Sequence, residues 1–323
     1  MTTPAPFGRV ALAISGPTAI GKTALAMAIA DELPARLISV DSAMVFRHMN
    51  IGTAKPTASE LESYPHALID LIEPTANYSA ADFLRDAKTE VTLAWEADQL
   101  PVFVGGTMLY FQALRDGLAE MPDRDAAVRD KIERAAREKG LPALHAQLAE
   151  LDAEAALGID PNNHQRIVRA LEVYQLTGKP ISSFWATAHE GLLPGLGGRL
   201  FEHALVPEDR TFLHDRINQR FEAMLRDGFV EELRGLWARG DLKPDMTSMR
   251  CVGYRQLLPF ITGECSLADA TQRGQAATRQ LAKRQLTWLR GWDRAGLLQC
   301  WECADDPRTH LSAILKQITL DTR

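Results

Sequence analysis

The sequence has little of several features that would place it in a specialised class of protein. Four cysteines in a chain of 323 residues do not make a disulfide framework. No window approaches the roughly 20 apolar residues of a membrane span, and the early stretch RVALAISG is too short for a secretory signal. There is no internal repeat or low-complexity tract. We therefore expect a cytoplasmic protein with reduced cysteines.

The chain also lacks an overall basic charge and the residue spacing of a metal site. Its net charge is −6, so a nucleic-acid role would require local basic patches. Cys300 and Cys303 form a C-x-x-C pair, but no second pair follows to complete a zinc site, which favours two ordinary thiols. His48, His66 and His164 show no metal spacing.

A glycine-rich stretch, GPTAIGKT at residues 16–23, lies between an apolar run and a helical pattern. Gly16, Gly21, Lys22 and Thr23 fit the motif G-x-x-x-x-G-K-S/T. Backbone N–H groups at a helix N-terminus favour anionic oxygens, Lys22 adds a cation for the outer phosphate, and Thr23 offers a hydroxyl to Mg²⁺. The stretch predicts a phosphate-binding P-loop, but the pattern does not choose among ATP, GTP and other phosphates.

Strand and helix patterns alternate along the first part of the chain. RVALAIS, ARLISVD and LPVFVGGT read as buried strands, YPHALIDLIEP as a strand or a strand and turn, and Ser79 with Asp82 as a capping box before a helix. From about Asp123 the patterns are helical, and LFEHALVP then returns to strand character after the loose LLPGLGGR. Two longer helices follow, one of them from about Ser266 to Trp292.

These patterns predict an α/β fold with a P-loop-containing parallel-sheet core and an all-helical insertion domain. The predicted boundaries are 8–122 for the first part of the core, 123–198 for the insertion and 199–323 for the second part with the C-terminal basic helices.

The neighbouring strands carry an unusual set of terminal residues for a nucleotide hydrolase. The strand LPVFV ends in Gly-Gly-Thr, where a metal-binding Asp would be expected, which weakens that interpretation. Asp41 ends the second strand instead. Because ligands bind outside the carboxyl ends of parallel strands, we expect Asp41, Thr107 and the P-loop to converge on one crevice. Asp41 is a candidate general base or metal ligand, and the alternative is a turn cap.

The basic patch lies near the C-terminus. Residues 273–294 hold six Lys and Arg against one Asp, a local charge of +5. On a helix the cations form one stripe and the apolar residues the opposite one: Arg279, Lys283, Arg290 and Arg294 against Leu281, Trp288 and Trp292. Such a face suits a polyanion, and the alternative is an ordinary solvated face. Arg220, on an earlier helix, could clamp a diphosphate, or could be a surface residue.

Together these residues resemble the bacterial form of the tRNA dimethylallyltransferase family, also called tRNA isopentenyltransferases. The resemblance is carried by GPTAIGKT, LISVDSAMVFRHMNIGTAKP, YSAADF, VGGTMLYFQAL, HQRIVRALEVY, RCVGYRQ and TRQLAKRQLTWLRGW, in order from about residue 9 to 292. Two positions depart from the family pattern: Met44 stands in place of Gln and Phe46 in place of Tyr.

The resemblance implies transfer of the dimethylallyl group from dimethylallyl diphosphate to N6 of the adenosine at tRNA position 37, beside the anticodon. It implies Mg²⁺ as cofactor and the P-loop as the diphosphate or nucleotide site, formed by Gly16, Pro17, Thr18, Ala19, Ile20, Gly21, Lys22 and Thr23, with Thr23 as the metal ligand. We expect a monomer, because no long apolar stripe is left over.

The resemblance also assigns roles to single residues. Asp41 matches the general base, Thr107 the hydroxyl beside the target base, and Arg220 the cation on the diphosphate. The helical insertion would grip the anticodon stem. The implied tRNA contacts are Asp41, Ser42, Ala43, Met44, Thr107, Arg129, Gln165, Arg166, Ile167, Val168, Arg169, Arg250, Cys251, Val252, Gly253, Tyr254, Arg255, Lys283, Arg284, Gln285, Leu286, Thr287, Trp288, Leu289 and Arg290.

Two rival functions use the same P-loop. A small-molecule or nucleotide kinase would bind ATP there and would have no need of the C-terminal basic helix. A non-catalytic RNA-binding ATPase or chaperone would bind RNA and make no modified product.

Overall fold

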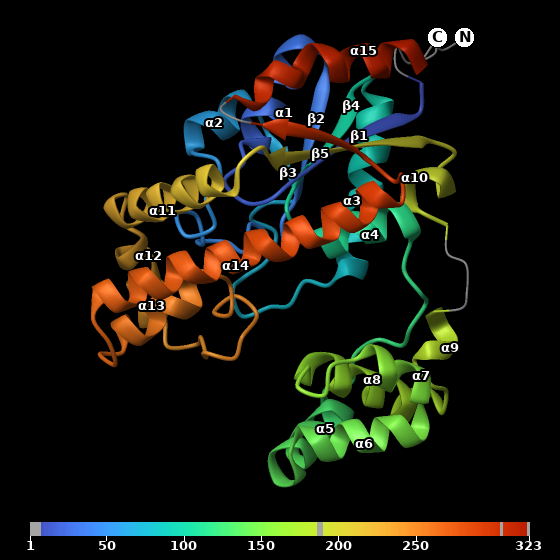
Figure 1. Ribbon diagram of the computed structural model, residues 1–323, viewed down its shortest axis with the longest axis vertical. Coiled ribbons are helices and arrows are strands. Elements are labelled where there is room, and N and C mark those ends of the chain that lie inside the picture. Colours follow the sequence, from blue (N-terminus) through green and yellow to red (C-terminus); the bar gives the residue numbers. More distant parts are fainter. Residues whose placement is uncertain (1–7, 186–189, 304–305, 322–323) are drawn as a thin grey trace. The chain divides into compact units, whose positions relative to one another are not determined.

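The computed structural model describes residues 8–185, 190–303 and 306–321, and within them six parallel strands form one sheet (Figure 1). The strand order is β3-β2-β4-β1-β5-β6. The strands are β1 (Val10–Ser15), β2 (Ala35–Val40), β3 (His66–Ala67), β4 (Leu100–Gly105), β5 (Arg199–Pro207) and β6 (Gln299–Cys303). The predicted parallel sheet is confirmed, and β1 lies at its centre with Leu12 between Val102 of β4 and Phe201 of β5.

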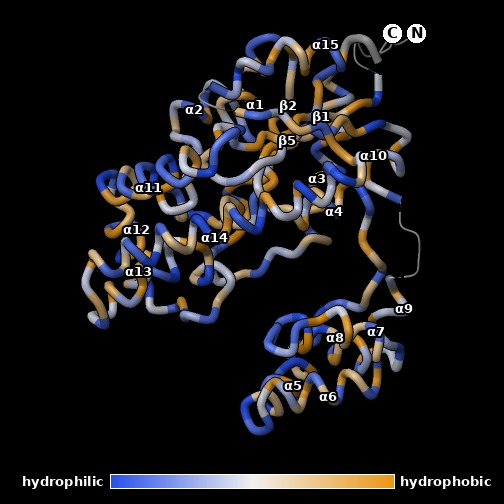
Figure 2. Tube along the Cα trace, in the orientation of Figure 1, coloured by the Kyte–Doolittle hydropathy of each residue, from blue (hydrophilic) through white to orange (hydrophobic). Residues whose placement is uncertain are grey.

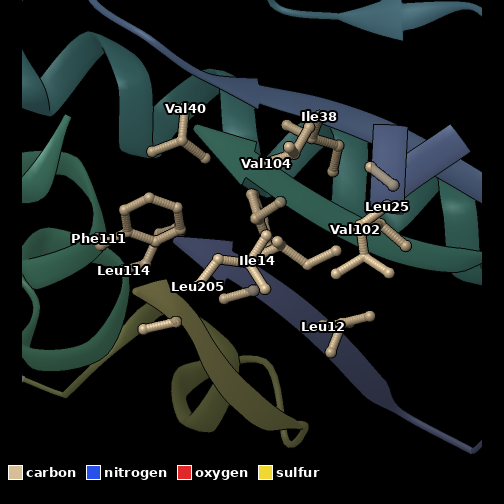
Figure 3. Packing of buried hydrophobic residues seen from close by; sticks show 14 of the residues in the cluster. Leu12, Ile14, Leu25, Ile38, Val40, Val102, Val104, Phe111, Leu114 and Leu205 are labelled. Atoms are coloured by element: carbon tan, nitrogen blue, oxygen red, sulfur yellow. The ribbon is translucent and has the colours of Figure 1, made fainter. Parts of the chain in front are cut away.

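The central strands are apolar at nearly every position because helices cover both of their faces. All six residues of β1 and of β4 are buried. Figure 3 shows Ile14 and Val104 packed with Leu25 from the first helix and Phe111 from the helix after β4. The hydropathy colours in Figure 2 show the same contrast between apolar strands and mixed surface helices.

Helices surround the sheet in the larger of two compact units, which comprises residues 1–115 and 191–323. The capping box predicted from Ser79 and Asp82 is confirmed at the start of the helix 80–96. The Ser79 hydroxyl accepts from the Asp82 N–H at 3.1 Å, and the Asp82 carboxylate accepts from the Ser79 N–H at 2.9 Å. The helices are α1 (Lys22–Glu32), α2 (Ala58–Ser63), α3 (Ala80–Glu96), α4 (Met108–Asp116), α10 (Leu192–Gly195), α11 (Arg210–Arg226), α12 (Phe229–Ala238), α13 (Tyr254–Ile261), α14 (Leu267–Arg294), the 3₁₀ turn η1 (Pro307–His310) and α15 (Leu311–Asp321).

The same unit contains a second apolar cluster beside the sheet core. Phe46 and Met49 from the segment after β2 pack there with Phe229 of α12 and Tyr254 of α13. This cluster joins the chain just after Asp41 to the helices that precede α14. The segment therefore has its own hydrophobic support and is not a loose loop.

The smaller unit, residues 116–190, is helical among its described residues. It has its own apolar core, which includes Ile132, Leu148 and Leu171. Its helices are α5 (Ala126–Lys139), α6 (Leu141–Leu151), α7 (Ala153–Gly158), α8 (His164–Thr177) and α9 (Ser182–Trp185). The boundaries between the two units fall at 115/116 and 190/191, whereas the sequence analysis placed them at 122/123 and 198/199. The predicted ranges 123–198 and 199–323 include residues 186–189, 304–305 and 322–323, which lie outside the described residues.

Several local features differ from the sequence-based expectations. YPHALIDLIEP contributes a strand of only two residues, and LLPGLGGR contains the short helix α10. The helix α14 continues to Arg294, beyond the predicted end at Trp292. The C-x-x-C pair lies in β6, an unpredicted edge strand, with Cys300 half-buried and Cys303 buried. Within the described ranges, no group of three or more His, Cys, Asp or Glu side chains could hold a metal ion.

No helix in the described part of the chain is long and apolar enough to cross a membrane.

Candidate active site

The P-loop connects β1 to α1 and leaves the first turn of α1 open to an anion. Gly21 is the N-cap of α1, with φ of 105°, and no side chain caps the helix. The first N–H groups of a helix without a side-chain cap are available to a ligand. Gly16 is required by close packing, because a Cβ there would lie 2.8 Å from the Leu205 carbonyl of β5.

Lys22 begins α1 and lies half-buried beside the loop, where its Nζ donates to the Pro17 carbonyl at 2.7 Å. Burial and, to a smaller extent, the Arg220 guanidinium lower the pKa of Lys22, the Asp41 carboxylate opposes them, and the net result is a pKa of about 7. The Lys22 ammonium therefore lies within electrostatic range of both the Arg220 guanidinium and the Asp41 carboxylate.

The carboxyl ends of β2 and β4 are joined side by side in a short network that we call the acceptor-side turn, formed by Asp41, Ser42, Gly106 and Thr107. The Val40 carbonyl accepts from the N–H groups of Gly106 at 3.2 Å and Thr107 at 3.1 Å. The Thr107 hydroxyl accepts from the Ser42 N–H at 3.0 Å. Gly105 must lack a side chain, because a Cβ there would overlap the backbone of Val40.

Asp41 caps the turn that follows β2. Its Oδ1 accepts from the N–H groups of Ala43 at 2.8 Å and Met44 at 3.2 Å. Its Oδ2 has no hydrogen-bond partner among the residues that the structure describes. Oδ1 therefore caps the turn, which is the alternative role of Asp41, whereas Oδ2 is available to a ligand.

Arg220 lies half-buried on α11, at the same site. Burial lowers the pKa of Arg220, the Asp41 carboxylate raises it, and Arg216, one turn earlier on the helix, lowers it. The P-loop lysine, Asp41 and Arg220 therefore lie within electrostatic range of one another.

Gln285 connects the two sides of this site from α14. The Gln285 Oε1 accepts from the Thr18 N–H of the P-loop at 2.9 Å, and its Nε2 donates to the Gly106 carbonyl at 2.7 Å. The sequence analysis placed Gln285 among the tRNA contacts. Its side chain is 6% exposed and faces inward, so this assignment is corrected to a contact within the protein.

Three further residues act at the site: Cys251, which was expected only as a tRNA contact, and Tyr110 and Arg216, which escaped the sequence analysis. The Asp41 carboxylate adds to the effect of burial in raising the pKa of Tyr110, and the same two causes raise the pKa of Cys251 to about 12. Arg216 acts on Arg220. Spacing could have indicated two of them, because Tyr110 is three residues after Thr107 and Arg216 four residues before Arg220 on helical patterns.

Of the residues expected to contact tRNA, some are exposed, some are buried and the others are partly buried, among them Asp41, Met44 and Thr107. The side chains of Ile167, Val168, Tyr254, Leu286 and Leu289 lie in apolar cores and are at most 9% exposed, so they are unavailable to a partner. They were included because the family resemblance implied the whole segments 165–169, 250–255 and 283–290 as tRNA-contacting regions. The exposed members are Ser42, Gln165, Arg166, Arg250, Arg255, Lys283, Arg284, Thr287 and Arg290.

Two cations of the helical unit have partners inside that unit. Arg169 donates to the fully buried Glu172 at 2.9 Å and to the Pro122 carbonyl at 2.7 Å, and Arg129 lies 3.8 Å from Glu172. A buried carboxylate without such partners would be costly. Arg129 and Arg169 therefore stabilise the unit, whereas Arg166 on the same helix is exposed.

The run IGTAKP, which follows the acceptor-side turn, is held by two charged side chains. The Glu232 carboxylate accepts from the N–H groups of residues 50–52, at 2.7 to 3.1 Å, and from the Tyr254 hydroxyl. Lys55 is buried, and its Nζ donates to Asp70 at 2.7 Å and to the Phe46 carbonyl at 3.0 Å. The conspicuous sequence of this run is explained by its packing.

The basic stripe of α14 lies on the side away from the sheet core. Lys283, Arg290 and Arg294 are exposed, and Arg279 is half-buried and donates to Asn218 at 2.7 Å. Trp292 packs inward, beneath the Arg115 guanidinium, and Trp288 is half-buried against it. Because the inner side also carries Gln285, one helix links the basic surface to the site.

The residues at the P-loop fit a magnesium ion shared with a phosphate ligand. Thr23 provides a half-exposed hydroxyl oxygen on the first turn of α1. Mg²⁺ prefers oxygen ligands and usually keeps several waters while binding substrate phosphates. A single protein hydroxyl is therefore a sufficient anchor when the ligand brings phosphate oxygens.

A surface pocket of about 490 Å³ lies elsewhere, at the start of β2. It is lined by residues such as Asp31, Pro34 and Tyr64, which belong to the end of the sheet opposite the P-loop. None of the predicted site residues lines this pocket. The candidate active site is instead placed beside the P-loop, where Lys22, Asp41 and Arg220 interact.

The fold and the site define a P-loop α/β protein with a carboxylate and a second cation at the carboxyl edge of its sheet, beside the loop. The chain belongs to the IPP transferase family, whose family model matches residues 44–292. The resemblance found in the sequence is thereby confirmed. The P-loop and Asp41 precede the matched range, so their assignment rests on the motif and the geometry.

Solved structures agree with this family. The chain is 33% identical to the tRNA isopentenylpyrophosphate transferase of Bacillus halodurans, over 97% of this chain and 98% of that one, with a TM-score of 0.68. It is 30% identical to the tRNA Δ(2)-isopentenylpyrophosphate transferase of Staphylococcus epidermidis, over 99% and 100%, with a TM-score of 0.66. A eukaryotic dimethylallyltransferase acting on tRNA shares the fold at 22% identity, over 97% and 78%, with a TM-score of 0.78.

Proposed function

We propose that the chain transfers the dimethylallyl group of dimethylallyl diphosphate to N6 of the adenosine at tRNA position 37, and releases diphosphate. Family membership supports a prenyl transfer to tRNA. The observation that carries the proposal is the electrostatic contact among Lys22, Arg220 and Asp41 at one edge of the sheet. Two cations suit a diphosphate, and the carboxylate beside them suits an amine that must lose a proton.

The P-loop side stabilises the leaving group. As the allylic C–O bond breaks, its electron pair goes to the diphosphate oxygen, and the first N–H groups of α1 with Lys22 and Arg220 balance the growing charge. Mg²⁺, held by Thr23 and the substrate phosphates, would add positive charge at the same oxygens. Lys22 must then release the Pro17 carbonyl to reach the diphosphate.

The acceptor side prepares the nucleophile. The lone pair of adenine N6 is delocalised into the ring, so a base that removes its proton as the N–C bond forms lowers the barrier. Asp41 takes this proton on Oδ2, while Oδ1 keeps the turn in place. Thr107, bonded to Ser42, provides a hydroxyl beside the target base. An adenine in a single-stranded loop leaves its stack at less cost than one in a duplex.

The tRNA is bound by exposed cations on an otherwise acidic protein. Arg250, Arg255, Lys283 and Arg290 are exposed and lie in the segments that the family resemblance implies. Arg166 offers the helical unit a cation for the anticodon stem. The chain acts as a monomer in the cytoplasm.

A product assay tests the proposal. The protein is incubated with dimethylallyl diphosphate, Mg²⁺ and unmodified tRNA, and the digested nucleosides are analysed by mass spectrometry. We expect N6-dimethylallyladenosine at position 37 and one diphosphate released for each. Phosphate transfer from ATP without this product would favour the kinase, and RNA binding without any product would favour the RNA-binding ATPase.

A further inference from the structure

Gln285 is a buried polar residue in the middle of a helix whose exposed side is basic. Its side chain is 6% exposed and lies among Ala282, Leu286 and Leu289 on the inner side of α14. An amide in such a position must have both of its ends hydrogen-bonded, because an unpaired buried polar group costs about 1–3 kcal/mol. The hydrogen-bond partners of the Gln285 amide therefore indicate the role of this residue.

Those partners belong to the two halves of the active site. The Thr18 N–H is part of the P-loop, and the Gly106 carbonyl directly precedes Thr107, whose hydroxyl holds Ser42. Through these two hydrogen bonds, of 2.9 and 2.7 Å, the Gln285 amide connects the P-loop to the acceptor-side turn.

The surroundings allow little room for this amide. A Cβ on Gly106 would overlap the Gln285 Nε2, so a glycine is needed at that position for the amide to approach the backbone. Gly106 is held from the other side by the Val40 carbonyl of β2. Gly106 is therefore held between β2 and α14, and Thr107, which follows it, also donates its N–H to the Val40 carbonyl.

We propose that Gln285 is a positioning residue for prenyl transfer, which sets the separation between the P-loop and the acceptor-side turn. The inference rests on the proposed function. Group transfer requires the reacting atoms within about 3–3.5 Å, and a displacement near 1 Å can cost about 10²-fold in rate. Gln285 acts on both sides at once, from the helix whose outer face carries the proposed tRNA-binding cations Lys283 and Arg290.

The main test replaces Gln285 by methionine, which has a similar length and removes both hydrogen bonds. We expect Gln285→Met to lower kcat by about 10- to 100-fold, with the tRNA Kd and its salt dependence changed less than about threefold. Gln280→Met, at an exposed position of the same helix, is the matched control and should retain wild-type kcat. Rates are normalised to active sites counted in a single-turnover experiment, so that partial unfolding does not lower kcat.

A double-mutant cycle separates positioning from a merely structural role. If Gln285 acts through Gly106 and Thr107, then Gln285→Met and Thr107→Ala together should lower kcat much less than the product of their separate effects. The cycle of Gln285→Met with Lys283→Ala should be multiplicative. Gly106→Ala displaces the amide without changing Gln285, and should reproduce the loss in kcat even if Gln285→Met folds poorly.

Three results would overturn the inference: wild-type kcat in Gln285→Met, a loss confined to the tRNA Kd, or multiplicative effects with Thr107→Ala. Each requires that the wild-type protein makes the prenylated product. Absence of that product from the wild-type reaction would instead reject the proposed function.

Discussion

The two sides of the active site are built in opposite ways. The P-loop consists of eight consecutive residues, and much of its binding capacity is in backbone N–H groups at the start of α1. The acceptor side is assembled from Asp41 after β2 and Thr107 after β4, which are far apart in the sequence. A contiguous motif can bind its ligand wherever its local structure forms. The acceptor side, by contrast, exists only when β2, β4 and β1 lie together in the sheet.

This difference indicates where single substitutions should have the largest effects. Backbone N–H groups survive a change of side chain, and several of them share the charge of the diphosphate. On the acceptor side, the proposed chemistry depends on one carboxylate oxygen of Asp41 and one hydroxyl of Thr107. The predictions below test this contrast, beginning with the largest expected effect.

Asp41 offers a substitution that separates its two roles. Asp41→Asn keeps an oxygen to accept from the Ala43 and Met44 N–H groups but cannot take a proton at that position. We expect kcat to fall by about 10³-fold, with the tRNA Kd nearly unchanged, because a general base contributes about 10²–10⁴-fold. Asp41→Ala should fall at least as far. Near-normal single-turnover rates for Asp41→Asn would leave Asp41 as a turn cap alone.

Thr107 allows a matched pair of variants. Thr107→Ala removes the hydroxyl that accepts from the Ser42 N–H, and it should lower kcat by about 10²-fold if this hydroxyl lies beside the target base as we propose. Thr107→Ser restores the hydroxyl and should stay within about threefold of wild type. Both are measured as prenylation rates at saturating tRNA. Equal losses in the two variants would assign the effect to the lost methyl group and its packing.

Lys22 should make diphosphate binding depend on pH. Its pKa of about 7 means that it is charged below pH 7 and neutral above, so affinity for dimethylallyl diphosphate should fall as pH rises, by about tenfold between pH 6 and 8. The diphosphate gains charge over the same range, so Lys22→Arg, charged throughout, is the control. The measurement is the ratio of the two Kd values at each pH. A constant ratio would contradict a neutral Lys22.

The basic face of α14 should give the smallest effect per residue. Lys283→Ala and Arg290→Ala should each weaken tRNA binding by a few-fold and reduce the slope of log Kd against log salt by about 0.7–0.9, the value for one lost phosphate contact. Lys88→Ala, which removes an exposed cation outside the predicted tRNA segments, should change neither quantity. Unchanged slopes for Lys283→Ala and Arg290→Ala would make this face a solvated helix surface.

Much of the fold could be predicted from local patterns. β1, β2, β4 and β5, the capped helix α3 and the long helix α14 follow from apolar runs, alternation and capping residues that lie close together in the sequence. The edge strand β6 and the two-residue strand β3 could not be predicted as they are, because an edge strand is short and its pairing depends on the neighbour it meets. The apolar cluster of Phe46, Phe229 and Tyr254 likewise joins segments with no common pattern.

By itself the sequence determined that this protein has a P-loop, strands of a parallel sheet, a helical insertion and a long basic helix near the C-terminus, because each is indicated by residues that lie close together in the sequence. The tertiary structure alone decided which members of those segments face inward. It made Arg169 a partner of a buried carboxylate, and it turned Gln285 away from the basic surface of α14 toward Thr18 and Gly106. Side-chain direction and long-range pairing depend on what packs against an element, and that is settled only when the whole core forms.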